Sequence, residues 1–216
     1  MKKGKLIVIE GCEGAGKGTV IATIKRAHPE FVFTREPGGT PLAEQIRNVI
    51  LDKTSTASAL TQLTCIFGAR ADHISKVILP SIEAGQTVIC DRFDLSSYAY
   101  QVYAPKALQN EEIFLALRKA IIPDNLPIYY MILDIPANIG LNRKKQQDEE
   151  QLFETKPVEF HTLVREGFKL GLEKITANSK NVRQTAIINA DEEKQVVAEQ
   201  VLNTIKNWQT NETEPS

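Results

Sequence analysis

The sequence has few cysteines, few histidines and no long apolar run. Its three cysteines lie far apart at positions 12, 65 and 90, and its three histidines, at 28, 73 and 161, form no metal-ligand spacing with them. A scattered, odd number of cysteines argues against a disulfide framework and favours a reducing compartment, so we expect the cytoplasm. No apolar run approaches the length of a membrane span, which argues against a membrane partner.

The sequence also lacks an excess of charge of either sign. Lys and Arg number 26 against 27 Asp and Glu, which gives a formal net charge of −1 and a pI near 6.3. This balance provides no basic footprint for nucleic acid, so we expect no nucleic-acid partner. The 216 residues, 42% of them hydrophobic, fit one domain with a sizeable core. We expect that domain to span 1–208, with a short lid at about 143–156 and a frayed polar tail at 209–216.

A glycine-rich loop stands near the start of the chain. Residues 11–19 read GCEGAGKGT and follow an apolar run, which predicts a strand, a phosphate-binding loop and then a helix. Glycines let backbone N–H groups surround phosphate oxygens, and the helix N-terminus adds a favourable dipole. Lys17 supplies a cation for the β- and γ-phosphates of a nucleotide. The expected nucleotide-binding residues are Gly11, Cys12, Glu13, Gly14, Ala15, Gly16, Lys17, Gly18 and Thr19.

Strand and helix patterns alternate along the chain, which indicates a parallel sheet with helices on both faces. Nearly continuous apolar runs predict strands at Lys5–Glu10, Phe31–Thr34, Thr87–Cys90, Ile128–Leu133 and Thr185–Ile188. Helical spacing predicts helices at Lys17–Ala27, Leu42–Leu51, Ser58–Ala84 (kinked by Pro80), Asn110–Ala120, Ala137–Gln146, Pro157–Asn178 and Lys194–Asn207. The predicted fold class is α/β, a three-layer α/β/α P-loop fold around a five-stranded parallel sheet.

Three charged motifs follow the predicted strands. REPGGT at 35–40 follows the second strand, DRF at 91–93 follows the third, and RKK at 143–145 comes shortly after the fourth. Ligands of such sheets bind beyond the carboxyl ends of the strands. This convergence favours an enzyme, because a kinase must hold a second anion and neutralise charge on the moving phosphoryl group. A nucleotide switch or binding module without acceptor chemistry is the alternative from another class.

Taken together, these motifs resemble those of the thymidylate kinases, a family of the nucleoside-monophosphate kinase superfamily. The resemblance covers most of residues 5–190 and rests on EGCEGAGK at 10–17, TREPGGTPL at 34–42, DRFDLSSYAYQ at 91–101 and VREGF at 164–168. It implies transfer of the γ-phosphate of ATP to dTMP, which gives dTDP for dTTP synthesis. It also implies a homodimer that binds ATP and dTMP.

The resemblance assigns an acceptor site residue by residue. Glu13 would approach the 3′-hydroxyl of the acceptor sugar, and Arg35 and Arg92 would grip the monophosphate through their planar forks. Arg70 would hydrogen-bond the thymine edge, and Tyr100 would crowd the sugar 2′ position. The implied dTMP-binding residues are Glu13, Arg35, Pro37, Phe67, Arg70, Arg92, Ser97, Tyr100 and Gln101.

One position departs from the family pattern. The family often places Phe four residues before the thymine-binding arginine, whereas this chain has Ile66 there and Phe67 next to it. Phe67 reaches the base only if its helix rotates or shifts; otherwise Ile66 forms a plainer apolar wall. A kinase for another nucleoside monophosphate is therefore the main alternative function.

The implied chemistry is direct in-line transfer to an acceptor phosphate oxygen that is already ionised, so no general base is required. Lys17, Arg92 and the lid residue Arg143 are the expected catalytic residues. Gly14 occupies a loop position where some relatives carry a basic residue, so the resemblance assigns that charge to the lid.

Mg²⁺ is the expected cofactor, bound together with ATP. Gly18 stands where a Ser or Thr hydroxyl normally meets the ion, and Thr19 follows one place late. Asp91 closes an apolar strand and is expected to hold the ion through water.

Overall fold

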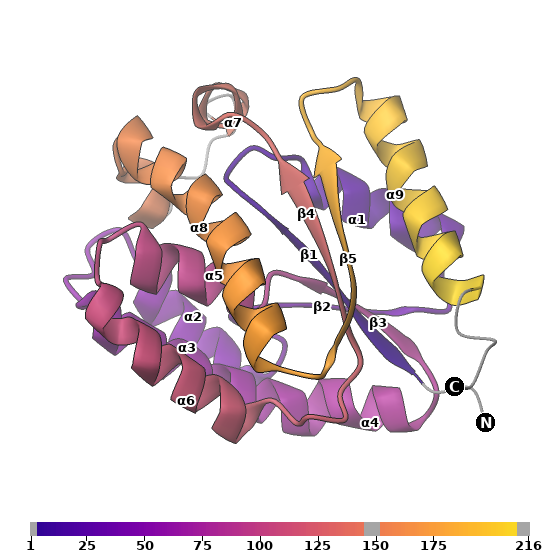
Figure 1. The fold of residues 1–216 in the computed structure, drawn as a ribbon, viewed down its shortest axis with the longest axis horizontal. Coiled ribbons are helices and arrows are strands. Elements are labelled where there is room, and N and C mark those ends of the chain that lie inside the picture. The colour runs from indigo at the N-terminus through magenta and orange to yellow at the C-terminus, as the bar shows by residue number, and fades with distance from the viewer. Residues whose placement is uncertain (1–3, 145–151, 211–216) are drawn as a thin grey trace.

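The computed structural model describes residues 4–144 and 152–210. The described chain forms one parallel sheet in the order β2-β3-β1-β4-β5 (Figure 1). Its strands are β1 (Lys5–Gly11), β2 (Val32–Arg35), β3 (Thr87–Asp91), β4 (Ile128–Asp134) and β5 (Val182–Asn189). The predicted α/β class with five parallel strands is confirmed, and each strand starts within three residues of its predicted start.

Helices and short helical turns connect the strands. The helices are α1 (Lys17–Ala27), α2 (Pro41–Leu51), α3 (Ala59–His73), α4 (Leu79–Glu83), α5 (Asp94–Tyr98), α6 (Glu111–Ile121), α7 (Ala137–Lys144), α8 (Val158–Asn178) and α9 (Lys194–Thr210). The π turns are η1 (Ile74–Ile78) and η2 (Ala99–Tyr103), and the 3-10 turns are η3 (Leu108–Asn110) and η4 (Leu152–Thr155). Within the described ranges, no helix is long and apolar enough to cross a membrane.

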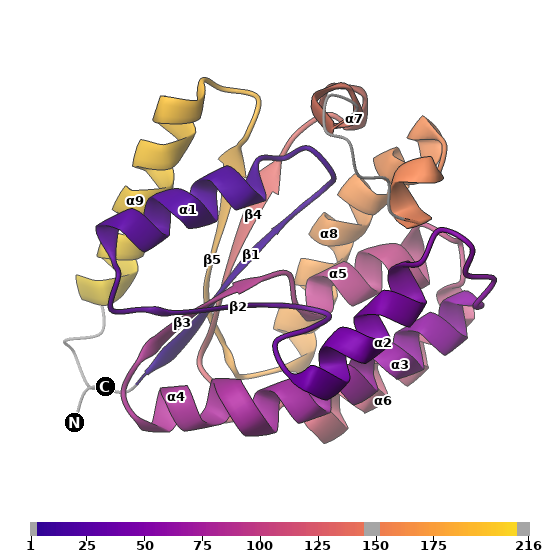
Figure 2. The same cartoon turned by 180° about the vertical axis from the view of Figure 1, so that it is seen from behind.

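Two apolar clusters hold these helices on opposite faces of the sheet. The central strand β1 alternates its side chains, as strands do, so Leu6 and Val8 enter one cluster while Ile7 and Ile9 enter the other. The first cluster packs the sheet against α3, α5, α6 and α8, and the second packs it against α1 and α9. Figures 1 and 2 show these two layers on either side of the strands. The core is therefore divided by the sheet, and the carboxyl ends of the strands stay open for a ligand.

The predicted helix at Ser58–Ala84 forms as a continuous helical run from Ala59 to Glu83, made up of α3, η1 and α4. Ser58 caps its start by accepting a hydrogen bond from the N–H of Thr61, as Ser residues do at helix N-termini. Before Pro80 the helix widens into η1, where the N–H of Leu79 donates to the carbonyl of Ile74, five residues back. Proline has no N–H and its ring crowds the preceding turn, so the wider turn accommodates it. The α-helical pattern resumes directly at Leu79 as α4.

The helical segment from Asp94 to Tyr103 has no counterpart in the sequence-based prediction. Its serines and tyrosines are modest helix formers, and α5 has no side-chain cap from its own N-cap residue, Phe93. The cap comes from β1 instead, because the Glu10 carboxylate accepts hydrogen bonds from the N–H groups of Phe93 and Ser96. A cap supplied from more than eighty positions away leaves no local signal.

The predicted tail and the predicted lid lie only partly within the described residues. The helix α9 continues to Thr210, so the first two residues of the predicted tail are helical, and 211–216 lie outside the described residues. Of the predicted lid, Arg143 and Lys144 end α7 and η4 covers 152–155, whereas 145–151 also lie outside the described residues. The single-domain and lid assignments stay predictions.

Candidate active site

The phosphate-binding loop connects β1 directly to α1. Gly16 is the N-cap of α1 and adopts a left-handed backbone with φ of 85°, and no side chain caps the helix. The first N–H groups of α1 therefore remain available to an anion. Lys17 lies at the start of this helix, where its Nζ donates to the carbonyls of Gly11 and Cys12 at 3.0 and 3.1 Å. Burial, followed by repulsion from Arg92, lowers the pKa of Lys17 below its ordinary value.

Gly14 shows why this loop carries no basic side chain at its tip. It has a φ of 71°, and a side chain added there would collide with the backbone of Gly140 in α7. The loop and the helix that leads into the predicted lid are thus packed against each other. Any additional cation must come from outside the loop.

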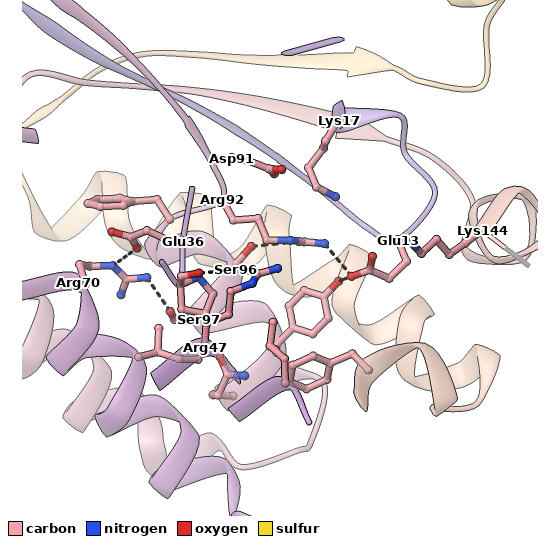
Figure 3. Close-up of a pocket in the computed structure, with 17 residues that line it drawn as sticks. Glu13, Lys17, Glu36, Arg47, Arg70, Asp91, Arg92, Ser96, Ser97 and Lys144 are labelled. Atoms are coloured by element: carbon pink, nitrogen blue, oxygen red, sulfur yellow. Dashed lines mark hydrogen bonds and ion pairs between the residues drawn. The ribbon is translucent and has the colours of Figure 1, made fainter. Parts of the chain in front are cut away.

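Next to the loop, the structure has a cavity of about 250 Å³. It is lined by the predicted residues Glu13, Lys17, Pro37, Arg70, Asp91, Arg92, Ser97, Tyr100 and Gln101. Residues that the sequence analysis did not assign to the site also line it, namely Glu36, Arg47, Leu51, Phe93, Ser96, Lys144 and Phe153, together with Ile66. Figure 3 shows Lys17 and Asp91 on one side of the cavity, Glu13 and Lys144 at one end, and Arg70 with Ser97 towards the other end.

Arg92 lies between the loop and α5. Its backbone is left-handed, with φ of 68°, which is unusual for a residue other than glycine. Its Nη1 donates to the carbonyl of Gly11 at 3.0 Å and to the hydroxyl of Ser96 at 3.2 Å, and its Nη2 forms an ion pair with Glu13 at 2.7 Å. The guanidinium therefore spans the gap between the nucleotide loop and the segment after β3.

Glu13 is an ionised hydrogen-bond acceptor in this site. Its Oε1 accepts from Arg92 and from the hydroxyl of Tyr100, the latter at 3.0 Å. Burial by itself raises the pKa of Glu13, but the charges of Arg92 and Lys17 outweigh burial and lower it to about 2. An ionised carboxylate accepts hydrogen bonds from hydroxyl groups and repels phosphate.

Glu10 holds the segment that carries Arg92. Its side chain is fully buried, and besides the two N–H groups of α5 it accepts a hydrogen bond from the hydroxyl of Ser96 at 2.5 Å. Burial raises the pKa of Glu10 to about 7, against the opposing effect of these donors and of Arg92. Glu10 thus reaches Arg92 through Ser96, although its position in β1 gives no hint of this contact.

This buried carboxyl predicts a pH-dependent stability. Because its pKa is about 7 in the folded protein and near 4.5 when exposed, the folded state binds more protons between these values. Relative to Glu10→Gln, the free energy of unfolding should be highest below about pH 4.5 and fall by roughly 3 kcal/mol as the pH rises through 7. Urea unfolding of both proteins from about pH 4 to 8 measures the difference, and parallel curves would contradict the assignment.

Arg35 lies outside the cavity, and its predicted contact with the monophosphate stays a prediction. Its side chain is 54% exposed and pairs with Glu44 at 2.9 Å. Arg47 lines the cavity instead and donates from Nη1 to the carbonyl of Pro37 at 2.9 Å. A signal for Arg47 was present in the sequence, because it lies four residues after Ala43 and three before Ile50, on the buried face of α2.

Phe67 also lies outside the cavity, whereas Ile66 lines it. Residues four apart share a helix face, so Ile66 and Arg70 face the cavity together while Leu63 and Phe67 face the core. The Phe67 ring packs edge-on against Phe114 at 5.7 Å. The helix rotation required to bring Phe67 to the base is not present.

Arg143 points away from the cavity towards the segment after β5. Its Nη1 donates to the carbonyl of Ala190 at 2.8 Å, and its Nη2 lies 3.4 Å from Asp191. The neighbouring Lys144 lines the cavity. A catalytic role for Arg143 stays a prediction, and it would need the side chain to leave Asp191.

Asp91 fits a metal-binding role by its position and bonding. It ends β3 beside Lys17 in the cavity, and its Oδ1 is buried without a hydrogen-bond partner among the described residues (Figure 3). An unpartnered buried carboxylate oxygen is costly unless a ligand or ordered water satisfies it. Carboxylate and water oxygens are suitable ligands for Mg²⁺.

A phosphate-binding loop facing several buried cations, beyond the carboxyl ends of a parallel sheet, defines a P-loop nucleotide kinase. The sequence model of the family described as Thymidylate kinase matches residues 9–201. The chain belongs to the thymidylate kinase family and is a nucleoside-monophosphate kinase. The resemblance inferred from the motifs is therefore confirmed, and the alternative of a switch without acceptor chemistry is not supported.

Individual relatives agree with the family match. The chain is 44% identical over 169 residues to a thymidylate kinase of Chlamydia caviae, which covers 75% of this chain and 81% of that protein. It is 37% identical over 205 residues to a thymidylate kinase of a Marinomonas species, covering 92% of each. The crystal structure of a thymidylate kinase from Ehrlichia chaffeensis superposes with a TM-score of 0.67 at 26% identity, covering 94% of this chain and 99% of that one.

Proposed function

We propose that the chain transfers the γ-phosphate of ATP to dTMP, giving ADP and dTDP. The observation that carries this proposal is that one continuous cavity joins Lys17 and Arg92, beside the phosphate loop, to Arg70, Ser97 and Gln101. Its cationic end suits two facing phosphate groups, and its other end offers hydrogen-bond donors and an apolar wall to a base. Membership of the thymidylate kinase family supports the same reaction.

In this reaction the protein acts by positioning and charge neutralisation. Lys17 and Arg92 hold the donor and acceptor phosphates, and Arg47 adds a third cation on the acceptor side. The acceptor oxygen is already ionised, so no general base is assigned. Glu13, kept ionised, accepts a hydrogen bond from the acceptor sugar, and the Tyr100 ring beside it restricts the space around that sugar.

Formation of dTDP tests this function directly. Incubation with ATP, Mg²⁺ and dTMP should give ADP and dTDP in equal amounts, as separated by anion-exchange chromatography. ADP release without dTDP would contradict the proposal.

The alternative function, a kinase for another nucleoside monophosphate, is favoured only by Ile66, which gives the base pocket an aliphatic wall in place of an aromatic one. A higher kcat/KM for dUMP, dCMP, dGMP or AMP than for dTMP would favour that alternative.

Thymidylate kinases generally need a divalent metal. We therefore propose that Mg²⁺ binds beside Asp91 together with ATP. When bound, Mg²⁺ neutralises charge on the β- and γ-phosphates. Asp91 would hold it through water, because Gly18 offers no hydroxyl.

The metal role of Asp91 predicts a change in nucleotide binding. Mg²⁺ should tighten ATP binding to the unmodified protein, and Asp91→Asn should lose about tenfold of that tightening, because the carboxylate charge is removed while the side-chain shape is kept. Isothermal titration calorimetry with and without MgCl₂ measures this without turnover. Asp52→Asn, at an exposed position outside the cavity, is the matched control. If Mg²⁺ raised the affinity for ATP equally in all three proteins, the role of Asp91 would be contradicted.

We further propose that the enzyme is a cytoplasmic homodimer without a nucleic-acid partner. The odd number and wide spacing of the three cysteines favour a reducing compartment. Exposed apolar side chains occur on the neighbouring helices α2, α3 and α6, namely Leu42, Val49, Leu60 and Ile113, and a second copy would cover such residues. Sedimentation velocity at micromolar concentration distinguishes a dimer from a 24.1 kDa monomer.

A further inference from the structure

The guanidinium of Arg70 is fixed on all sides but one. Its Nε donates to Glu36 Oε2 at 2.7 Å and its Nη2 donates to Ser97 Oγ at 3.0 Å (Figure 3). The rings of Phe67 and Phe93 lie 4.4 and 4.9 Å from the guanidinium carbon. The third nitrogen, Nη1, is buried and has no hydrogen-bond partner among the described residues. Because Arg70 lines the cavity, this unpaired donor is the atom that a ligand can satisfy.

Glu36 determines how this guanidinium is oriented. Its carboxylate is 1% exposed and both oxygens are occupied, one by Arg70 and the other by His73 Nδ1 at 2.9 Å. A carboxylate only accepts hydrogen bonds, so Nδ1 carries the proton. The His73 Nε2 lies 2.6 Å from the Thr34 hydroxyl and forms a hydrogen bond with it, so both ring nitrogens of His73 are held. The Glu36 carboxylate thereby stays in place to pair with the buried Arg70 guanidinium.

The chain from Thr34 through His73 to Glu36, called here the Arg70 support chain, joins two separate elements. Thr34 belongs to β2, Glu36 follows it, and His73 and Arg70 both belong to α3. Gly39 packs against the same histidine, since a side chain there would lie 2.5 Å from His73 and 2.7 Å from the Thr34 hydroxyl. The loop after β2 and the helix α3 are therefore locked together at the point where Arg70 enters the cavity.

We propose that Glu36, held by His73, is a specificity-determining positioning residue that directs Arg70 Nη1 towards the base of the acceptor nucleotide. This inference rests on the proposed function. A guanidinium only donates hydrogen bonds, so a fixed Nη1 favours a base that presents a carbonyl oxygen, as thymine does. Cytosine presents an amino group at the corresponding position, which leaves two donors facing each other. Uracil keeps the carbonyl and lacks only the methyl group.

The experiment compares the dissociation constants of dTMP, dUMP and dCMP for Glu36→Gln and the unmodified protein, measured by calorimetry. The amide offers one acceptor oxygen to two donors and leaves the Arg70 charge without its partner. The preference for dTMP over dCMP should fall about tenfold, through weaker dTMP binding. The preference for dTMP over dUMP and the KM for ATP should stay unchanged, because thymine and uracil present the same carbonyl to Arg70 and the Arg70 support chain forms no side-chain hydrogen bond with the phosphate loop among the described residues.

A pair of His73 variants tests the same point independently. His73→Asn keeps an N–H donor close to the Nδ1 position and should preserve the dTMP-to-dCMP preference. His73→Phe removes that donor, frees the Glu36 carboxylate and should lower the preference several-fold. Asp94→Asn is the matched control, because Asp94 pairs with Arg118 Nε at 2.7 Å in an equally buried site that does not line the cavity.

Three outcomes would overturn the inference. The first is a folded Glu36→Gln protein that keeps its preference for dTMP over dCMP. The second is an equal preference in the two His73 variants, which decides the question if Glu36→Gln does not fold. The third is an equal loss of preference in Asp94→Asn, which would mark the effect as general destabilisation. A failure of the proposed function is distinguishable, because in that case the unmodified protein does not convert dTMP to dTDP.

Discussion

Replacing Lys17 by alanine is expected to lower kcat for ATP and dTMP by about a thousandfold, in line with the loss of a fixed charge at a phosphoryl-transfer centre. Lys17 is the loop cation, and its Nζ donates hydrogen bonds to the carbonyls of Gly11 and Cys12. Burial and Arg92 already lower its pKa, so its charge is poorly compensated until phosphate arrives. Its main contribution is therefore to bind the transferring phosphate.

The same substitution should change stability little. Alanine loses two hydrogen bonds to backbone carbonyls, about 1–2 kcal/mol, and removes the charge repulsion from Arg92 together with the attraction to Glu13 and Asp91. Lys25→Ala, at an exposed position on the same helix, is the matched control and should keep full turnover. Steady-state kinetics and thermal unfolding of the three proteins separate the two effects. Unchanged turnover in Lys17→Ala would refute the assignment of the loop.

Replacing Arg92 by lysine is expected to reduce kcat/KM for dTMP by a factor of about 10² to 10³, although the positive charge is kept. One ammonium cannot contact Gly11, Ser96 and Glu13 in the arrangement that the planar guanidinium provides. Arginine and lysine at position 92 have the same unfavourable backbone energy at a φ of 68°. The substitution therefore tests only the effect of the side chain.

The control for this variant is Arg118→Lys. Arg118 forms an equally close pair with Asp94 and does not line the cavity, so its loss should lower the thermal midpoint without an equivalent loss of kcat/KM. Comparable kinetic losses in the two variants would mean that Arg92 acts only by stabilising the fold. Retention of full activity by Arg92→Lys would contradict its role at the phosphates.

The sequence predicted best what lies at the ends of the strands. Asp91 and Arg92 stand at the carboxyl end of β3, and Lys17 begins the helix that follows β1. The parallel sheet brings these two strand ends to one edge, where all three residues line the cavity. The apolar runs located the inner strands closely because β1, β3 and β4 are buried on both faces. The edge strand β5 alternates half-buried and exposed side chains and starts three residues before its predicted start.

Residues carried by helices were harder to place. A shift of one position along α3 turns a side chain by about 100°, which separates Ile66, facing the cavity, from Phe67, facing the core. The motif around Arg70 does not specify which of these two neighbouring positions faces the cavity. The periodicity of α2 places Arg47 on the buried face of that helix, with Ala43 and Ile50.

Contacts between distant segments had no signal in the sequence. Glu10 caps α5 from β1, and Arg143 pairs with Asp191 across the carboxyl ends of the sheet. The Glu36 contacts with Arg70 and His73 likewise depend on how the loop after β2 meets α3. Each requires the packed arrangement of the elements, which local patterns do not specify.

One competition experiment tests the central claim that this cavity is an acceptor site for dTMP. The protein is given ATP labelled in its γ-phosphate, Mg²⁺ and an equimolar mixture of dTMP, dUMP, dCMP, dGMP and AMP, with Arg70→Ala run alongside. We predict that the label enters dTDP before any other product, and that Arg70→Ala loses this preference. Label found mainly in another diphosphate, or only in free phosphate, would contradict the account.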